Sequence, residues 1–309
     1  MRFQLAGLLN RSRRWRERGW TPISAEDYRA AWHHWGGSVA THPDVVAELS
    51  DLAGIPVDYL GWFADGSNSE LQAALPAWGR HIALSREVLK QRGKRDTFDL
   101  GNAEIILPQA PGSLIRLRHR ARYVSDLHAD HVHGLRRQRQ DLALARPPEE
   151  YSKKFLYNQR RERRLLEGQG GVVRPIGTLS AQDIADMYTE LFEKRWGFPV
   201  PGKPNLVAVF SRLHTFLTGA YITVQDQPAA IQILYRAQAP GWISIEYVNS
   251  GVDPAWNALS PGSVLSFVNT QDAWTDARSR GKPLRYSFGR VDREYKMRWC
   301  YPTPSHATG

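Results

Sequence analysis

A strand followed by a helix and a second strand, in the last third of the chain, is the feature that most constrains the fold. Residues 242–248 (WISIEYV) form an apolar run typical of a strand. Ser260 and Pro261 then have the pattern of a helix N-cap and a first helical residue, and the short strand Leu284–Phe288 precedes Tyr295–Trp299. Because the first turn of a helix leaves backbone N–H groups unpaired, we expect this helix to begin at a site for an anionic group.

The segments before this unit predict an antiparallel sheet covered by helices. We expect a basic helix over Tyr151–Glu167, a strand at residues 172–176, a helix that begins at Ser180, and a helix over about Asn205–Leu217. Three strands in meander order follow, at Ala220–Gln225, Ala229–Tyr235 and Trp242–Val248. A meander that continues into a helix and a strand favours the α+β class over a doubly wound nucleotide-binding sheet.

The first half of the chain predicts a similar order of elements. Helices are expected from Ser24 and from Pro43. Strands are expected at Asp58–Phe63, Leu71–Trp78 and Asn102–Leu107, with an Asp65–Gly66 turn between the first two. The proline-rich linker at residues 146–148 separates the halves, so we predict domains at residues 1–148 and 149–309.

The balance of charges favours an anionic partner. The 309 residues contain 41 Lys and Arg against 31 Asp and Glu, which gives a formal net charge of +10. Nucleic acid, a phosphorylated glycolipid, a membrane face and a nucleotide-bearing cofactor all meet this condition. The one cysteine, Cys300, excludes an intramolecular disulfide framework and a multi-cysteine zinc site.

The N-terminal segment does not have the features of a membrane span or a secretory signal. Its apolar part is far shorter than the roughly 20 residues that a span needs, and no small-residue cleavage site follows it, so we expect the protein in the cytoplasm. Leu5, Leu8 and Leu9 precede five arginines between residues 11 and 18. This pattern predicts either contact with an anionic inner-membrane surface or a solvated, frayed terminus.

A second basic stretch lies before the linker. Within Leu114–Val124 every second position is arginine, at Arg116, Arg118, Arg120 and Arg122. In a strand these side chains would share one face, where a bound anion would offset their repulsion; the alternative is a solvated edge strand whose charge discourages pairing. The four histidines between residues 119 and 133 lack helical metal-site spacing, and the arginines would repel a dication, so we expect no metal.

Five short motifs, in order over about residues 150–300, resemble those of FemAB-like acyltransferases. They are Ser152–Arg161 (SKKFLYNQRR), Arg195–Trp196, Ser260–Leu265, Tyr286–Gly289 and Tyr295–Lys296. Together with Gly36–Ser38, Thr41–Pro43 and the overall length, they make the chain most similar to the Mig-14 family, which is linked to antimicrobial-peptide resistance.

The resemblance implies two tandem acetyltransferase-like (GNAT) domains, the first degenerate, and a mostly antiparallel mixed sheet flanked by helices. It also implies transfer of an acyl or aminoacyl group, without a tightly bound cofactor. The usual phosphate loop of acetyltransferases has more glycines than Leu259–Ser263 (LSPGS), so fewer backbone groups can approach the pyrophosphate of an acyl-CoA. FemAB-like proteins tolerate such a loop because their donor is aminoacyl-tRNA, whose phosphates can be held by scattered Arg and Lys.

The resemblance and the strand order together predict the site residues. Lys296, in the aromatic–Lys pair, holds an oxyanion or a phosphate, or else is a solvated lysine. Glu246 and Tyr247 precede the expected anion site and take or relay the acceptor proton, although Glu246 could equally be a surface residue. Tyr286 orients the acceptor or simply packs. The predicted donor or phosphate ligands are Ser260, Gly262, Ser263, Lys153, Arg160 and Arg161, and Asn249 joins the four arginines as an acceptor or anion ligand.

Three functional hypotheses follow. The first is an aminoacyl transferase, in particular an alanyl transferase, or an acyl transferase that modifies an amino sugar of lipopolysaccharide or another envelope glycolipid, with tRNA as a partner. The second is a non-catalytic module that binds RNA or anionic lipid on a decayed transferase fold. The third is an acyl-CoA-dependent N- or O-acyltransferase.

Overall fold

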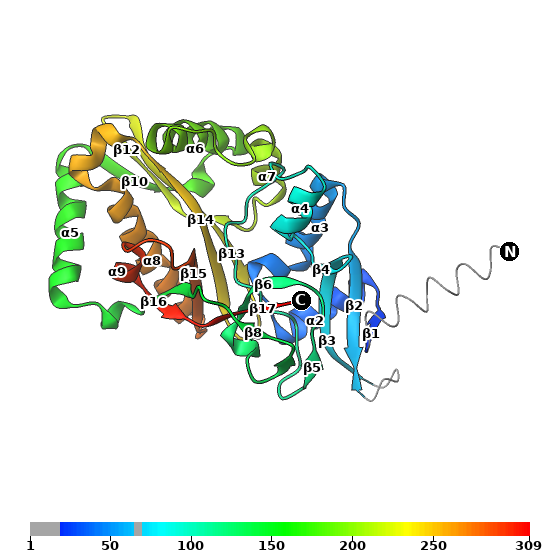
Figure 1. Ribbon diagram of the computed structural model, residues 1–309. Coiled ribbons are helices and arrows are strands. Elements are labelled where there is room, and N and C mark those ends of the chain that lie inside the picture. The colour runs from blue at the N-terminus through cyan, green and yellow to red at the C-terminus, as the bar shows by residue number, and fades with distance from the viewer. Residues whose placement is uncertain (1–18, 65–69) are drawn as a thin grey trace.

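The computed structural model describes residues 19–64 and 70–309, which form two mixed α/β halves joined side by side (Figure 1). The basic N-terminal segment and the expected Asp65–Gly66 turn lie outside the described residues. No helix in the described part of the chain is long and apolar enough to cross a membrane.

The first half is built on an antiparallel sheet in the order β1-β2-β3-β4. These strands are Trp20–Pro22, Asp58–Phe63, Leu71–Trp78 and His81–Ile82. Helix α2 (Ala25–Trp35) packs on β2 and β3, and α3 (Pro43–Ala53) packs on α2, while α4 is the short helix Arg86–Gln91. The start of α2 is fixed by the predicted capping box, in which Ser24 Oγ accepts the Asp27 N–H at 3.0 Å.

Two strand predictions for the first half are wrong. Residues 102–107 make only an isolated bridge, from Ile105 to Val124, and form no strand. The arginine-rich stretch is not one strand but two, β5 (Ile115–Arg116) and β6 (Ala121–Ser125), which lie in different small sheets. Strand β5 pairs with β7 (Val132–His133), and β6 pairs with β17 (Ser305–Thr308), which also pairs with β8 (Arg136–Arg137). The four arginines therefore do not share the face of a single strand.

The second half is built on an eight-stranded sheet with the order β10-β12-β13-β14-β15-β9-β16, in which β11 also pairs with β13. The strands are β9 Leu142–Ala145, β10 Gly171–Pro175, β11 Leu217–Thr218, β12 Ala220–Val224, β13 Gln227–Gln238, β14 Ile243–Val252, β15 Leu284–Arg290 and β16 Cys300–Thr303. The predicted meander is confirmed as β12, β13 and β14. Strands β14 and β15 are parallel because α8 (Pro261–Ser279) crosses between them.

Helices cover both faces of this sheet. Helix α6 (Ala181–Trp196), which begins at the predicted Ser180 capping box, packs on β13 and β14 from one side, and α8 packs on the other. Helix α5 (Lys153–Gly168) lies outside α8, at the edge of the molecule farthest from the first half (Figure 1). Helix α9 is Lys296–Trp299, and α7 is Leu206–Arg212, which is shorter than the predicted helix because a turn and β11 follow it.

The two halves share strands and a core. Strand β9 precedes the proline-rich linker but lies between β15 and β16 of the second sheet, and β17 returns from the end of the chain to the first half. The largest cluster of buried apolar side chains contains Trp32 and Val46 of the first half together with Ile184 and Phe192 of the second. The predicted domain boundary at residue 148 stays a prediction.

Candidate active site

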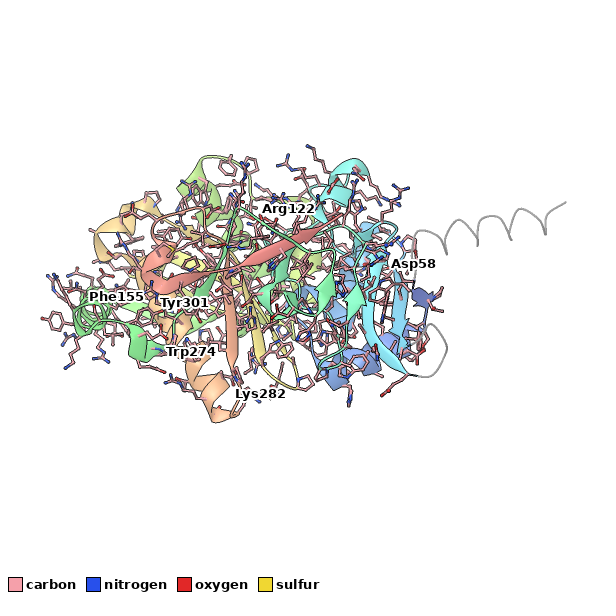
Figure 2. The ribbon with its side chains drawn as sticks, turned by 60° about the horizontal axis from the view of Figure 1, so that its bottom comes forward. Asp58, Arg122, Phe155, Trp274, Lys282 and Tyr301 are labelled. Carbon is pink, nitrogen blue, oxygen red and sulfur yellow. The ribbon has the colours of Figure 1, made fainter. Side chains whose placement is uncertain are left out.

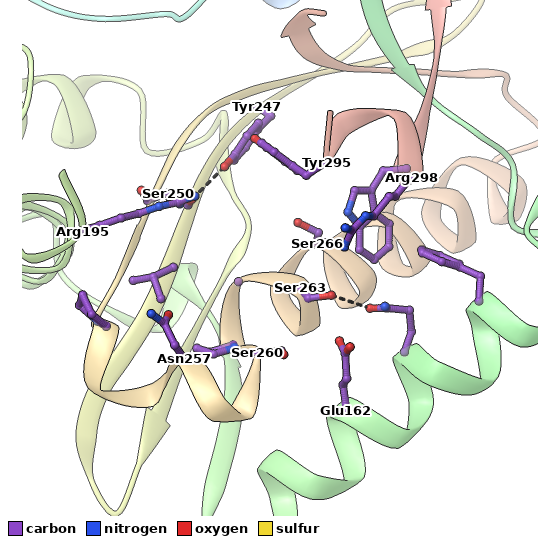
Figure 3. Close-up of a pocket in the computed structure, with 17 residues that line it drawn as sticks. Glu162, Arg195, Tyr247, Ser250, Asn257, Ser260, Ser263, Ser266, Tyr295 and Arg298 are labelled. Carbon is purple, nitrogen blue, oxygen red and sulfur yellow. Dashed lines mark hydrogen bonds between the residues drawn. The ribbon is translucent and has the colours of Figure 1, made fainter. Parts of the chain in front are cut away.

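A pocket lies where the parallel strands β14 and β15 separate. Their pairing runs from Ile243 with Leu284 to Glu246 with Ser287, and β14 then continues to Val252 without β15 beside it. The opening is bordered by α5, the C-terminal part of β14, the start of α8 and the segment around α9, and it has a volume of about 400 Å³. The side chains that line it come from segments more than 140 residues apart, as Figure 3 shows.

The start of α8 forms the floor of this pocket. Pro261 is the first helical residue, as predicted, but Ser260 does not cap the helix with its side chain, because its backbone is left-handed (φ 50°, ψ 42°). The Ser260 carbonyl instead accepts the N–H groups of Ser263 at 3.0 Å and Val264 at 3.1 Å. Pro261 has no N–H, so Gly262 supplies the one first-turn amide without a hydrogen-bond partner among the described residues.

Gly262 leaves room above this amide. A Cβ built on it would meet Val252 Cγ2 at 3.4 Å, which is an ordinary contact, so the packing of the helix does not require glycine here. Both residues line the pocket. The missing side chain therefore leaves the Gly262 N–H accessible to a ligand oxygen, which is the role of a backbone donor at a helix N-terminus.

A chain of hydrogen-bonded side chains crosses the opposite wall. The Arg195 guanidinium at the end of α6 donates to the Ser250 hydroxyl and, at 3.4 Å, to the Ser250 carbonyl. Tyr247 Oη donates to the same Ser250 hydroxyl at 2.9 Å (Figure 3). Burial, followed by the neighbouring Tyr247, raises the pKa of Tyr295, so its hydroxyl keeps its proton at neutral pH. The wall thus presents a fixed cation and protonated hydroxyl groups.

The third wall is the inner face of α5. Gln159 Oε1 accepts the Ser263 hydroxyl at 3.0 Å and so ties α5 to the start of α8. Glu162, three residues later, also lines the pocket, and its Oε2 atom is buried without a hydrogen-bond partner among the described residues. Glu162 is the one acidic residue among the lining side chains, whereas Arg195 and Arg298 are the basic ones.

Four of the predicted site residues come together at this pocket, namely Tyr247, Ser260, Gly262 and Ser263. Six other lining residues were not predicted as site residues from the sequence: Gln159, Glu162, Arg195, Ser250, Tyr295 and Arg298. Two signals were available: Glu162 is an acid within a strongly basic helix, and it follows Gln159 by three residues, which places both on one helix face.

The predicted catalytic residue Glu246 lies outside the pocket lining. It is next to Tyr247 in β14, so the two side chains point to opposite faces of the sheet. Glu246 is 2% exposed, and its Oε1 accepts the Glu104 N–H at 2.9 Å. Burial, followed by the nearby Glu104 carboxylate, raises the pKa of Glu246 well above its ordinary value. The structure therefore places Glu246 in the contact between the halves.

Lys296 and Tyr286 also lie outside the lining, although Lys296 is next to Tyr295. The Lys296 ammonium donates to the Arg290 carbonyl at 2.9 Å and pairs with Asp292 at 2.9 Å. Tyr286 is a residue of β15 and is 1% exposed. Its side chain lies in the core, where burial raises the pKa of its hydroxyl. Their roles in catalysis stay predictions.

The remaining predicted ligands are distributed over other surfaces. Lys153, Arg160 and Arg161 are exposed on α5 and do not line the pocket. Asn249 uses its side-chain oxygen to accept the Ser250 N–H at 2.9 Å. The arginines of residues 116–122 belong to the first half, and Figure 2 shows Arg122 well apart from Phe155, the first pocket residue of α5.

No metal site is evident in the parts of the chain that the structure describes. Within residues 19–64 and 70–309, no group of three or more His, Cys, Asp or Glu side chains is placed to hold a metal ion. His119 and His128 are buried, and burial lowers the pKa of each to about 4. His128 instead accepts the Leu107 N–H with Nε2 at 2.9 Å.

The α+β fold in two halves, with a pocket where two parallel strands separate, places the chain in the structural class of tandem acetyltransferase-like and FemX-like proteins. FemX superimposes with a TM-score of 0.51 at 11% sequence identity, over 89% of this chain and 90% of FemX. The sequence profile of the Mig-14 family matches residues 42–308, so the chain belongs to the Mig-14 family. Both the predicted fold class and the predicted family are confirmed.

Two further solved structures are similar over most of their length. L-PGS from Bacillus licheniformis has a TM-score of 0.46 at 11% identity, over 93% of this chain and 91% of that chain. A tandem GNAT protein from the clavulanic acid biosynthesis pathway has a TM-score of 0.44 at 11% identity, over 94% and 97%. A sequence search of curated proteins finds no match.

Proposed function

We propose that the protein is an aminoacyl or acyl transferase whose reaction takes place in the pocket between α5, β14 and α8. The observation that carries this proposal is the convergence of a free backbone amide, at Gly262, with the Arg195–Ser250–Tyr247 chain around one cavity. Acyl transfer requires fixed hydrogen-bond donors where negative charge develops and a proton donor for the leaving group. The pocket offers both kinds of group.

In the proposed reaction, the acceptor nitrogen attacks the carbonyl carbon of the donor ester. The carbonyl oxygen becomes an oxyanion, and the Gly262 N–H stabilises it. The carbon–nitrogen bond forms, the bond from the carbonyl carbon to the leaving oxygen breaks, and that oxygen takes a proton from Tyr295. The proton that the attacking nitrogen loses on becoming an amide restores Tyr295. Tyr247, which donates to Ser250, neighbours Tyr295 in this wall. Arg195 fixes Ser250 and adds positive charge to this wall.

Aminoacyl-tRNA is the proposed donor. The segment Leu259–Ser263, which leads into α8, has one glycine, so it offers few close backbone approaches for the pyrophosphate of coenzyme A. The outer face of α5, next to the pocket, instead carries Lys153, Lys154, Arg160, Arg161 and Arg164, all exposed. Scattered cations of this kind suit the phosphates of tRNA. Acyl-CoA is the alternative donor, and a transfer assay run with both donors distinguishes the two.

The proposed acceptor is an amino sugar of lipopolysaccharide or another envelope glycolipid, and the transferred group is alanine or a similar amino acid. Such a transfer converts the sugar amine into an amide and adds the ammonium of alanine, so the charge is kept while the size and hydrogen-bonding groups of the headgroup change. We propose that this change underlies a role in resistance to cationic antimicrobial peptides. We place the reaction at the cytoplasmic face of the inner membrane, where the protein would lie peripherally.

Mass spectrometry of envelope glycolipids from cells with and without the protein tests the proposal. Loss of a mass increment equal to one amino-acid residue supports an aminoacyl-tRNA donor, and loss of an acetyl or fatty increment supports acyl-CoA. Identical spectra, together with no transfer by the purified protein from either donor, contradict a transferase. The variant Tyr295→Phe is expected to lower transfer by about 10²-fold, the usual size of a general-acid contribution.

The second candidate function is a non-catalytic module that binds RNA or anionic lipid. The five exposed cations of α5 favour it, because no ion pair among the described residues involves them. A salt titration of tRNA binding separates the two functions when it is combined with the transfer assay. Strongly salt-dependent binding without any turnover supports the module, whereas turnover that Tyr295→Phe reduces supports the enzyme.

A further inference from the structure

The pocket contains a buried carboxylate oxygen that has no hydrogen-bond partner in the part of the chain that the structure describes. Glu162 Oε2 has no hydrogen-bond partner among the described residues. A buried carboxylate oxygen is completed by water or by a ligand, and this one lies beside a cavity that can admit a ligand. Figure 3 shows the carboxylate of Glu162 pointing from α5 toward the start of α8, into the space between them.

The sequence of α5 prevents Glu162 from forming an ion pair within its own helix. The positions three and four residues away are Asn158, Gln159, Leu165 and Leu166, and none of them is a cation. The other acid of the helix, Glu167, does have such a partner, because Arg163 Nε contacts its Oε1 at 2.8 Å. A helix with six basic residues thus leaves its one pocket-facing acid without a cation.

The other walls do not supply a partner either. Gln159 is held by the Ser263 hydroxyl, and among the described residues its Nε2 makes no hydrogen bond to Glu162; the Arg195 guanidinium is directed to Ser250. Among the described residues no ion pair joins Glu162 to Arg195 or Arg298, the two cations of the pocket. A ligand that enters the pocket can therefore complete Glu162 with a hydrogen-bond donor, best with a positive one.

We propose that Glu162 binds the ammonium group of an amine acceptor and takes its proton, so that the pocket selects amines over hydroxyl groups. This inference rests on the proposed transferase function and specifies its acceptor. An ammonium offers three N–H donors and a charge that a carboxylate compensates, whereas a hydroxyl offers one neutral donor. A carboxylate can take a proton from either kind of nucleophile as a general base, so the expected selectivity rests on the positive charge of the ammonium, which the carboxylate compensates.

The step balances as follows. The ammonium R–NH₃⁺ transfers one proton to Glu162 and becomes the neutral amine, which attacks the donor carbonyl and forms the carbon–nitrogen bond. The ester bond breaks, and the second proton lost by nitrogen appears on the leaving hydroxyl. Glu162 then releases its proton to solvent, so one ester and one ammonium give one amide, one alcohol and one proton.

The test compares two acceptors that differ at one atom position, the octyl glycosides of glucosamine and of glucose, with alanyl-tRNA and acetyl-CoA as donors. For the full-length protein, kcat/KM for the amine is expected to exceed that for the hydroxyl compound by about 10²-fold or more. Glu162→Gln is expected to lower kcat/KM for the amine by about 10²-fold and to leave kcat/KM for the hydroxyl compound unchanged. Glu167→Gln, on the same helix, is the matched control and is expected to leave both unchanged.

The outcomes separate this inference from the proposed function. Equal transfer to both glycosides, or an unchanged rate of amine transfer in Glu162→Gln, overturns the role of Glu162 while the transferase stands. If the wild type transfers to neither acceptor, calorimetric binding of the glucosamine glycoside decides. Binding that is weakened about tenfold in Glu162→Gln keeps the ammonium site and rejects the transferase, and binding unaffected by the variant rejects both. Thermal unfolding midpoints within about 2 °C of each other establish that the variants fold.

Discussion

The molecule contains two buried acidic regions whose side chains have opposite surroundings. In the contact between the halves, Glu246 receives the Glu104 N–H, and Arg285 bridges Glu104 and Asp126, the latter at 2.7 Å. In the pocket, Glu162 has an oxygen with no hydrogen-bond partner within residues 19–64 and 70–309. The comparison teaches that burial alone does not mark a reactive carboxylate. The absence of a partner, next to an open cavity, distinguishes the pocket from a structural network.

The largest expected effect on stability comes from the network of Glu104, Asp126, Glu246 and Arg285 between the halves. Arg285 contacts Glu104, which is 0% exposed, so Arg285→Met leaves a buried carboxylate without its cation. We expect a loss of about 3–5 kcal/mol in the free energy of unfolding, measured by urea denaturation. Glu162→Gln is expected to change it by less than about 0.5 kcal/mol. Equal losses in the two variants would abolish the distinction between the regions.

Acid should weaken the network through His128. Burial lowers the pKa of this histidine to about 4, against 6.5 in the unfolded chain, so the unfolded state binds more protons between these values. The stability that neutral His128 contributes is present above pH 6.5 and is lost as the pH falls through 4, by up to about 3 kcal/mol. Urea unfolding between pH 7 and 4 measures this loss. A His128→Gln variant with the same pH dependence as the wild type would show that other groups cause it.

Lys296 offers an intermediate effect that separates structure from catalysis. Lys296 is 7% exposed. Its ammonium donates a hydrogen bond to the Arg290 carbonyl and forms an ion pair with Asp292. Lys296→Met is therefore expected to reduce the free energy of unfolding by about 1–3 kcal/mol. If the role is structural, kcat measured at 15 °C, where the variant stays folded, is unchanged. A fall in kcat of tenfold or more at that temperature would restore Lys296 to the mechanism.

Gly262→Ala should move stability and activity in opposite directions. Alanine is a better helix former than glycine, so the free energy of unfolding should stay the same or rise by up to about 1 kcal/mol. The added methyl group lies beside Val252 in the pocket and covers the free amide. We expect transfer to fall by about tenfold or more, as when one oxyanion donor is obstructed. An unchanged rate would remove the amide from the proposed mechanism.

The smallest effect is expected at the arginines of the first half. Arg120 is exposed and its contact with Glu87 is 3.7 Å long, so Arg120→Gln should change the free energy of unfolding by less than about 0.5 kcal/mol. Its distance from the pocket predicts an unchanged transfer rate. A loss of binding to tRNA in this variant, at constant salt, would extend the anion-binding surface into the first half.

Local features were the part of the structure that sequence could predict. The Ser180 box forms as expected, with Ser180 Oγ accepting the Asp183 N–H at 3.1 Å, and α8 begins at Pro261. These outcomes depend on residues three or fewer positions apart. The meander was equally accessible, because its turns are short and its strands are apolar.

The site was only partly predictable, because non-local pairing creates it. Strands β14 and β15 separate after Glu246, so Tyr247 faces the pocket and Glu246 does not. The alternating pattern of β14 alone does not reveal where the two strands separate. Glu162 lies within the run Arg160–Arg164, which predicts a basic helix surface and does not indicate a buried acid. Its importance follows from the absence of partners, which is a property of the folded chain.

The return of β17 to the first half has a consequence for biosynthesis. Residues 305–308 complete the sheet that contains β6 and β8, so these two strands have no neighbour between them until that segment has left the ribosome. The edges of β6 and β8 that face β17 therefore stay unpaired during translation of the intervening residues. This small sheet is therefore completed only after residues 305–308 have been translated, although β6 and β8 are made much earlier.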